Sequence, residues 1–169
     1  MGLKFPCMHP VVLIRSGCEG DNKMILSKGL KASSPLTTAQ IEKRLNDVGV
    51  SATAQRIAIC KYILCEADHP TAEDIKNWTD LNFPKLSRAT VYNTLEILVQ
   101  AGLLKELKLP HTGKIVYDTN VEEHFHFLDS ATGKLFDVSP EECQVTLAMP
   151  KDISVQGVEV FLRGKISIK

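Results

Sequence analysis

The sequence lacks several features that would assign it to a well-known class of protein. No apolar run approaches the roughly 20 residues that a membrane-spanning helix needs, and the apolar patch Val11–Ile14 lacks the length and the cleavage site of a secretory signal. The five cysteines form no C-x-x-C pair and are odd in number, which argues against a Cys-rich zinc site and a disulfide framework. These absences predict a cytoplasmic protein that does not enter the membrane and whose thiols are reduced and mostly buried.

The net charge is zero, because 20 basic side chains are matched by 20 acidic ones. This balance argues against a simple polycation that coats nucleic acid. The charges are nevertheless polarised: residues 1–35 carry five basic and two acidic residues, residues 36–118 carry ten and ten, and residues 119–169 carry five and eight. Between residues 84 and 114 there are five basic side chains and two acidic ones, a local excess of the kind that contacts phosphates.

Hydroxyl residues placed before apolar patterns predict four short helices. The expected caps are Thr37 or Thr38, Thr53, Thr71 and Ser87. The residues expected to face inward are Ile41, Leu45 and Val48 in the first helix, Ile57, Cys60 and Leu64 in the second, Ile75 and Trp78 in the third, and Val91, Leu95 and Leu98 in the fourth. His69 is expected at the start of the third helix.

Two β-prone segments follow the helices, at Leu103–Leu109 and Lys114–Asp118, and a Pro-His-Thr-Gly turn separates them. Helices followed by such a hairpin predict a winged helix-turn-helix domain over residues 36–118. Residues 1–35 show no sustained periodicity and are expected to be a flexible extension, in which Met24 offers an alternative start of translation.

After Asp118 the pattern changes to strands. Residues 124–129 alternate, a turn is expected at residues 131–133, residues 134–138 form the return strand, and residues 154–162 form a Val-rich third strand. The SPEE and MPKD segments between them are expected to be loops. Because about fifty residues make a marginal domain alone, residues 119–169 are predicted to pair with a second copy. The fold class is therefore α+β: an N-terminal winged helix-turn-helix domain followed by a small, mainly-β dimerisation domain.

The fourth helix has the features of a DNA-recognition helix, whose N-terminal half enters the major groove. Arg88 can pair with guanine or phosphate, and Tyr92 can contact a thymine methyl group or a phosphate. The full set of predicted DNA-binding residues is Arg56, Ser87, Arg88, Thr90, Tyr92, Asn93, Lys105 and Lys114. An ordinary amphipathic surface helix has the same pattern, so the pattern alone leaves both interpretations open.

Histidines and carboxylates form a second constellation. On a strand, the alternation in His124-Phe125-His126 places both imidazoles on one face, about 7 Å apart at Cα. The candidate ligands are His69, Asp118, His124, His126 and Asp137. Such a mixed nitrogen and oxygen set suits Fe(II), Mn(II) or Zn(II) rather than ions that prefer thiolates. A lone H-x-H is more often a pair of surface histidines, so this pattern also leaves two interpretations open.

Five segments, AQRIAI, DHPTAEDI, SRATVYNTLEILVQAGLLKEL, YDTNVEEHFHF and TGKLFDV, occur in this order up to residue 138. Together they resemble the ferric uptake regulator (Fur) family, most closely its peroxide-sensing (PerR) and iron-responsive (Irr) branches. The resemblance implies a dimeric, metal-dependent repressor of an AT-rich inverted repeat in double-stranded DNA, with a regulatory metal on the five candidate ligands. Aspartate at position 137, where iron-sensing members usually have glutamate, resembles the PerR branch.

The chain departs from the family where many members bind a structural zinc through two C-x-x-C pairs. The place of the first pair reads Asp129-Ser130-Ala131-Thr132, and no cysteine follows Cys143. No structural zinc is therefore expected, and the regulatory ion is expected to be Fe(II) or Mn(II), with Zn(II) as an alternative in vitro. By the same resemblance, peroxide acting at bound Fe(II) would oxidise His69 or His124.

Three other functions stay open at this point. One is an Irr-like regulator of iron or haem supply, although Cys7-Met8-His9-Pro10 lacks the expected Cys-Pro dipeptide. Another is a non-haem iron enzyme. Five protein ligands would leave little room on the ion for a substrate, so no enzyme is predicted. The last is an inactive dimerisation module, which would show neither metal-dependent DNA binding nor turnover.

Overall fold

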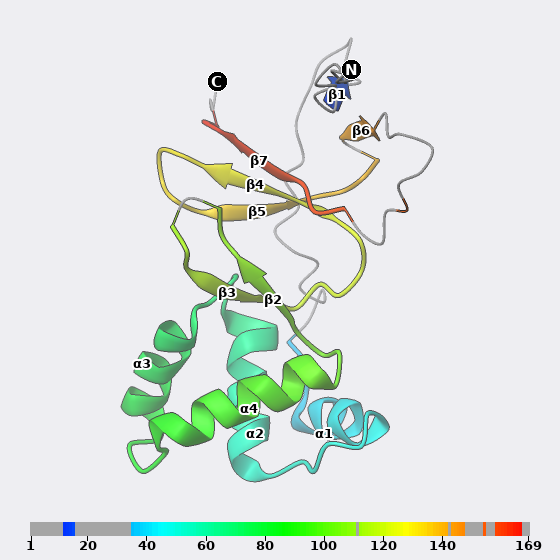
Figure 1. Ribbon diagram of the computed structural model, residues 1–169. Helices are drawn as coiled ribbons and strands as arrows, with labels where there is room; N and C mark the ends of the chain where they lie inside the picture. The colour runs from blue at the N-terminus through cyan, green and yellow to red at the C-terminus, as the bar shows by residue number, and fades with distance from the viewer. Residues whose placement is uncertain are drawn as a thin grey trace, which may run out of the picture. The chain divides into compact units, whose positions relative to one another are not determined.

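The computed structural model describes residues 12–15, 35–110, 112–141, 143–147, 154 and 158–166. It divides into two compact units: a helical unit of residues 28–123, and a β unit made of residues 1–27 and 124–169 (Figure 1). Within the described ranges, every helix is too short or too polar to cross a bilayer.

The helical unit contains four α-helices: α1 (Thr38–Asp47), α2 (Ala54–Lys61), α3 (Ala72–Asn82) and α4 (Arg88–Gln100). Each begins after a hydroxyl residue whose side chain accepts a hydrogen bond from a backbone N–H of the first turn. These caps are Thr37, Thr53, Thr71 and Ser87, as the sequence predicts. The first and third caps are completed by Gln40 and Asp74, whose side chains bond back to the cap residue.

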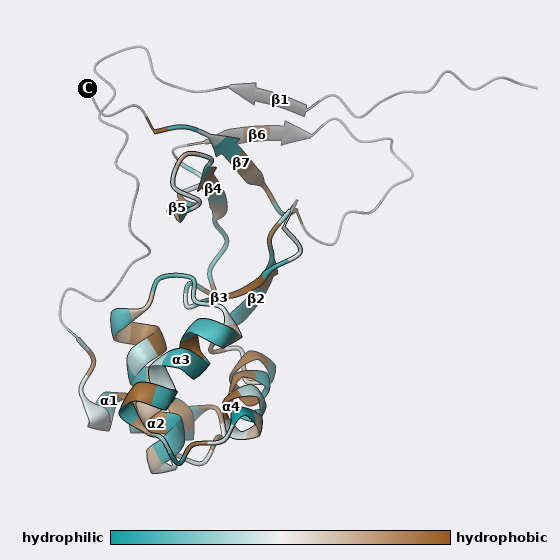
Figure 2. Ribbon diagram, turned by 90° about the vertical axis from the view of Figure 1, so that its left-hand side faces the viewer, coloured by the Kyte–Doolittle hydropathy of each residue, from teal (hydrophilic) through white to brown (hydrophobic). Residues whose placement is uncertain are grey.

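The core of the helical unit lies between these helices, around Ile41, Ile59, Ile75 and Leu95, all fully buried. Figure 2 shows apolar and polar residues alternating around the helices, as expected for amphipathic helices. The prediction for Val48 is wrong: α1 ends at Asp47, and Val48 is 40% exposed.

The second helix does not end where its α-helical hydrogen bonds end. It continues as a π-helix, η1 (Tyr62–Glu66), in which the amide of Ala67 donates to the carbonyl of Tyr62 over 2.9 Å. Ile63 is fully buried, four residues after the buried Ile59, whereas Leu64, predicted to face inward, is only partly buried. The Tyr62 ring stacks on Trp78 of α3, with 4.5 Å between ring centroids.

A two-stranded wing follows the helices. Strand β2 (Lys105–Lys108) pairs antiparallel with β3 (Ile115–Asp118), and Lys105 lies opposite Asp118. The connecting turn contains Gly113, whose φ of +66° favours glycine. Four helices and this hairpin form a winged helix-turn-helix, which confirms the predicted fold of this part of the chain.

The β unit contains a three-stranded sheet in the order β5-β4-β7, where β4 is Phe125–Asp129, β5 is Leu135–Val138 and β7 is Phe161–Gly164. Strands β4 and β5 are antiparallel, whereas β4 and β7 are parallel. The hairpin is as predicted. The last predicted strand, over residues 154–162, is wrong in position: its described part is non-strand up to residue 160, and β7 extends to Gly164.

A separate antiparallel pair joins β1 (Val12–Arg15) to β6 (Gln144–Leu147). The sequence predicts neither strand, and it predicts that residues 1–35 form a flexible extension. Each segment has only four residues and its partner lies far away in the chain, so no local pattern announces the pairing.

The turn between β4 and β5 is held by side-chain oxygen atoms. The Asp129 carboxylate accepts hydrogen bonds from the Thr132 hydroxyl over 2.6 Å and from the Ala131 amide over 3.1 Å. The Ser130 hydroxyl donates to the carbonyl of Gly164 over 2.8 Å, which attaches the turn to β7. The bond from Thr132 is the main reason that the pKa of Asp129 lies below its ordinary value. The folded β unit therefore favours the ionised carboxylate.

Acidification is expected to destabilise the β unit through Asp129. Because its pKa is lower in the folded state, its stabilising contribution is complete above the unfolded pKa of about 3.9 and is lost as the pH falls towards the folded value. The Asp129→Asn variant should therefore lose less free energy of unfolding than the wild type as the pH falls from 5 to below about 3. Urea unfolding followed by the NMR amide signals of β4 and β5 measures this, with the exposed Glu141→Gln as control. Equal pH dependence in all three proteins would contradict the role of Asp129.

Candidate metal site

His69 lies in the loop between η1 and α3, two residues before the cap of α3. Its φ is +44°, a backbone conformation that few residues other than glycine adopt. The expectation that His69 begins the third helix is therefore wrong. One reason is Pro70, because a following proline disfavours the α-helical conformation of the residue before it.

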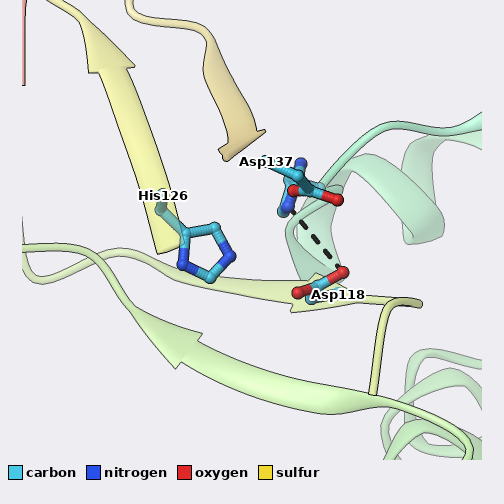
Figure 3. Close-up of side chains that lie close together, drawn as sticks. Asp118, His126 and Asp137 are labelled. Carbon is cyan, nitrogen blue, oxygen red and sulfur yellow. Dashed lines mark ion pairs between the residues drawn. The ribbon is translucent and has the colours of Figure 1, made fainter. Parts of the chain in front are cut away.

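The imidazole of His69 lies between two carboxylates. Its Nδ1 lies 3.0 Å from Oδ1 of Asp68, and its Nε2 lies 3.8 Å from Oδ1 of Asp118, the ion pair drawn as a dashed line in Figure 3. The side chains of His69 and Asp118 are buried, whereas that of Asp68 is half-exposed. Asp68 thus fixes the orientation of the ring, and Nε2 points towards Asp118. His69 and Asp118 are called the helical half-site below.

In the β unit, strand register brings two histidines and a carboxylate together. His126 of β4 is paired directly with Asp137 of β5, and His124 immediately precedes β4. The Nε2 atoms of His124 and His126 are 2.9 Å apart, and Nε2 of His124 lies 3.7 Å from Oδ1 of Asp137. Figure 3 shows His126 and Asp137 as sticks. His124, His126 and Asp137 are called the β half-site below.

The β half-site is buried, and one of its rings packs against a neighbouring strand. The exposed fractions of His126 and Asp137 are 5% and 3%, and the His126 ring stacks on Phe161 of β7 with 5.2 Å between ring centroids. Two imidazole nitrogens and a carboxylate oxygen that converge in this way are a donor set suited to Fe(II), Mn(II) or Zn(II). The residues present therefore fit a divalent metal ion.

The predicted DNA-binding residues have different environments in the helical unit. Tyr92 and Asn93 are exposed on α4, and Lys114 is exposed on the wing. Ser87 and Thr90 bond to each other at the start of α4. Three of the predicted cationic side chains bond within the unit: Arg56 to the carbonyl of Ser51, Lys105 to the carbonyl of Glu122, and Arg88 to the carboxylate of Glu73.

Two residues of these sites are absent from the sequence prediction. Asp68 directly precedes His69, so its adjacency to a candidate ligand is a signal that could have identified it. Glu73 is fifteen residues from Arg88, and no local pattern indicates their contact. His111 and the segment from Cys7 to Pro10 lie outside the described residues.

Comparison with known proteins relates this chain to a family of regulators. The model of the Ferric uptake regulator family matches residues 47–160, more than half of the chain. The peroxide-responsive repressor PerR of Staphylococcus aureus (strain NCTC 8325 / PS 47) is 36% identical over 93 residues, which are 55% of this chain and 62% of the relative. The chain thus spans about three fifths of the length of the curated relatives that it matches.

Solved structures support the same fold. The ferric uptake regulator of Vibrio cholerae superposes with a TM-score of 0.57 at 20% identity, over 74% of this chain and 98% of that chain. The peroxide stress regulator of Campylobacter jejuni superposes with a TM-score of 0.51 at 22% identity, over 79% of this chain and 98% of that chain. At these identities the likeness concerns the fold alone. The family match carries the assignment, and the chain belongs to the ferric uptake regulator family.

Proposed function

We propose that this chain is a metal-dependent, DNA-binding transcriptional repressor that acts as a homodimer and responds to peroxide. The observation that carries the proposal is the β half-site, in which two imidazole nitrogens lie 2.9 Å apart beside the carboxylate of Asp137. Membership of the Fur family supports regulation by a metal ion. The matched relatives are named as repressors and regulators, so we assign no enzymatic activity. A cytoplasmic location is part of the same proposal.

In this proposal the two half-sites bind one ion. The β half-site supplies three ligands and the helical half-site supplies two, and together they provide the mixed nitrogen and oxygen set that Fe(II) and Mn(II) accept. Binding one ion with ligands from both units would favour a single arrangement of those units. A ligand shifts a conformational equilibrium only by its differential affinity for the two states, and a shared ion has that differential affinity. We assign Fe(II) or Mn(II) as the physiological ion, Zn(II) as a substitute in vitro, and no structural zinc.

DNA binding is assigned to α4 and the wing. The exposed Tyr92 and Asn93 and the N-terminal Arg88 lie in the half of the helix that enters the major groove in helix-turn-helix proteins. In a dimer, two such helices must match half-sites about 34–36 Å apart, so a change in the arrangement of the units changes affinity. The proposed target is an AT-rich inverted repeat.

The peroxide response is assigned to the histidine ligands. Bound Fe(II) would supply the electrons that reduce peroxide, with an oxidant produced next to the ligands. His69 and His124 would be the oxidised residues, one in each half-site, and an oxidised imidazole binds metal less well. The similarity to PerR of Staphylococcus aureus and the aspartate at position 137 support this assignment.

Removing one ligand from either half-site is expected to weaken the same metal site. His126→Ala and Asp118→Ala should each lower the Mn(II) affinity by about tenfold or more, and the wild type should bind one regulatory ion per chain. Isothermal titration after chelation measures both quantities. Before metal is added, elemental analysis should find no zinc, and the protein should still be folded. His111→Ala, which removes a histidine that belongs to neither half-site, is the control. Two independent sites per chain, each lost in only one variant, would contradict the shared ion.

Sequence-specific DNA binding is expected to depend on α4. Arg88→Ala and Tyr92→Ala should each weaken binding of the Mn(II)-loaded dimer to the inverted repeat by roughly 1–3 kcal/mol if each makes a good base contact, and affinity should fall steeply with salt. Fluorescence anisotropy with the repeat and with random DNA measures this. Lys43→Ala removes an exposed charge from α1 and serves as control. If both α4 variants still distinguish the repeat from random DNA as well as the wild type does, α4 is not the recognition helix.

Peroxide is expected to release only the iron-loaded protein from DNA. Brief exposure to a low concentration should dissociate the Fe(II) form and leave the Mn(II) form bound, because Mn(II) does not reduce peroxide under these conditions. Mass spectrometry should find an added oxygen atom on His69 or His124 of the released protein. Asp137→Glu should keep metal-dependent DNA binding and blunt the release. Release with cysteines oxidised and all histidines intact would rule out this mechanism.

A further inference from the structure

The first turns of α3 and α4 are joined by an ion pair. Glu73 is the second residue of α3, and Arg88 is the first residue of α4. The guanidinium contacts both oxygen atoms of the carboxylate: Nη1 lies 2.9 Å from Oε2, and Nη2 lies 3.2 Å from Oε1. This is the bidentate geometry in which arginine binds a carboxylate most specifically.

The Glu73–Arg88 ion pair is exposed and is not a structural brace of the core. The side chains of Arg88 and Glu73 are 59% and 53% exposed, and exposed ion pairs contribute little to folding stability. The hydrogen bonds and charge of Glu73 are the main reasons that the pKa of Arg88 is raised, with Tyr92 as a smaller cause. Glu73 therefore neutralises a solvent-facing cation, Arg88, which lies next to Tyr92 of the proposed recognition helix.

The Glu73 carboxylate binds the guanidinium of Arg88, a group that also binds phosphates. The guanidinium fork fits carboxylate and phosphate groups with the same two parallel hydrogen bonds, and the N-termini of two helices add partial positive charge around it. The neighbouring acid, Asp74, is bonded to the amide and hydroxyl of Thr71 as part of the α3 cap. Glu73 is therefore the acid of this turn that contacts Arg88.

We propose that Glu73 is an intramolecular competitor of DNA for Arg88, and hence a residue that sets the balance between specific and non-specific binding. This inference rests on the proposed DNA-binding function. On random DNA, Arg88 remains paired with Glu73 and adds no phosphate contact. On the correct site, a guanine edge or a well-placed phosphate replaces Glu73.

The test uses the full-length, Mn(II)-loaded protein and the variant Glu73→Gln, which keeps the size of the side chain and removes its charge. Its affinity for a random duplex should rise by about twofold to fivefold, the equivalent of one exposed ion pair. The slope of log affinity against log salt should steepen by about 0.9, the increment for one additional phosphate contact. Glu96→Gln is the matched control, because it makes the same charge change on α4 at a residue that bonds to Gln100 and not to Arg88.

A double-mutant cycle assigns the effect to Arg88. In the Arg88→Ala background, Glu73→Gln should leave the affinity for random DNA and the salt slope unchanged. Equal effects of Glu73→Gln and Glu96→Gln, or no effect of Glu73→Gln on a wild type that binds DNA, would overturn the competitor role and leave the proposed function standing. Absence of DNA binding in both the wild type and Glu73→Gln, with folding and Mn(II) binding intact, would overturn both proposals.

Discussion

The backbone amide of Tyr117 donates a 2.9 Å hydrogen bond to the carbonyl of Pro70, and this bond joins the wing to the loop before α3. Each of the two bonded residues is adjacent in sequence to a residue of the helical half-site: Asp118 follows Tyr117, and His69 precedes Pro70. The bond therefore holds together the two side chains of the helical half-site, although their positions differ by 49 in the chain. Tyr117 is itself 8% exposed and belongs to the core of the helical unit, so the position of the half-site is set by the packing of that core.

Features with a local cause could be predicted from the sequence. The four helix starts depend on one hydroxyl side chain and the next three residues, and each is found where it is expected. The β half-site is also largely local, because strand alternation places His124 and His126 on one side and a short turn brings Asp137 opposite His126. The winged-helix fold follows from the order of these local elements.

Features with a distant cause could not be predicted in the same way. The pairing of β1 with β6 and the contact of Glu73 with Arg88 each need two segments that only the folded chain brings together. The π-helical turn after Lys61 breaks the 3.6-residue period on which the inward-facing positions were predicted. The left-handed backbone of His69 is a fourth case, since φ > 0 is rare for histidine and depends on the surrounding contacts.

The turn from Asp129 to Thr132 needs no metal ion, although a Cys-rich zinc site can hold a turn of this kind. Thiolates bound to zinc lose the metal when they are oxidised, and such damage can be irreversible. The Asp129 carboxylate and the Thr132 hydroxyl, joined by a 2.6 Å hydrogen bond, contain no sulfur and need no metal. Neither peroxide nor a chelator therefore breaks this contact. This turn of the β unit is therefore held without a metal ion and without a thiol group.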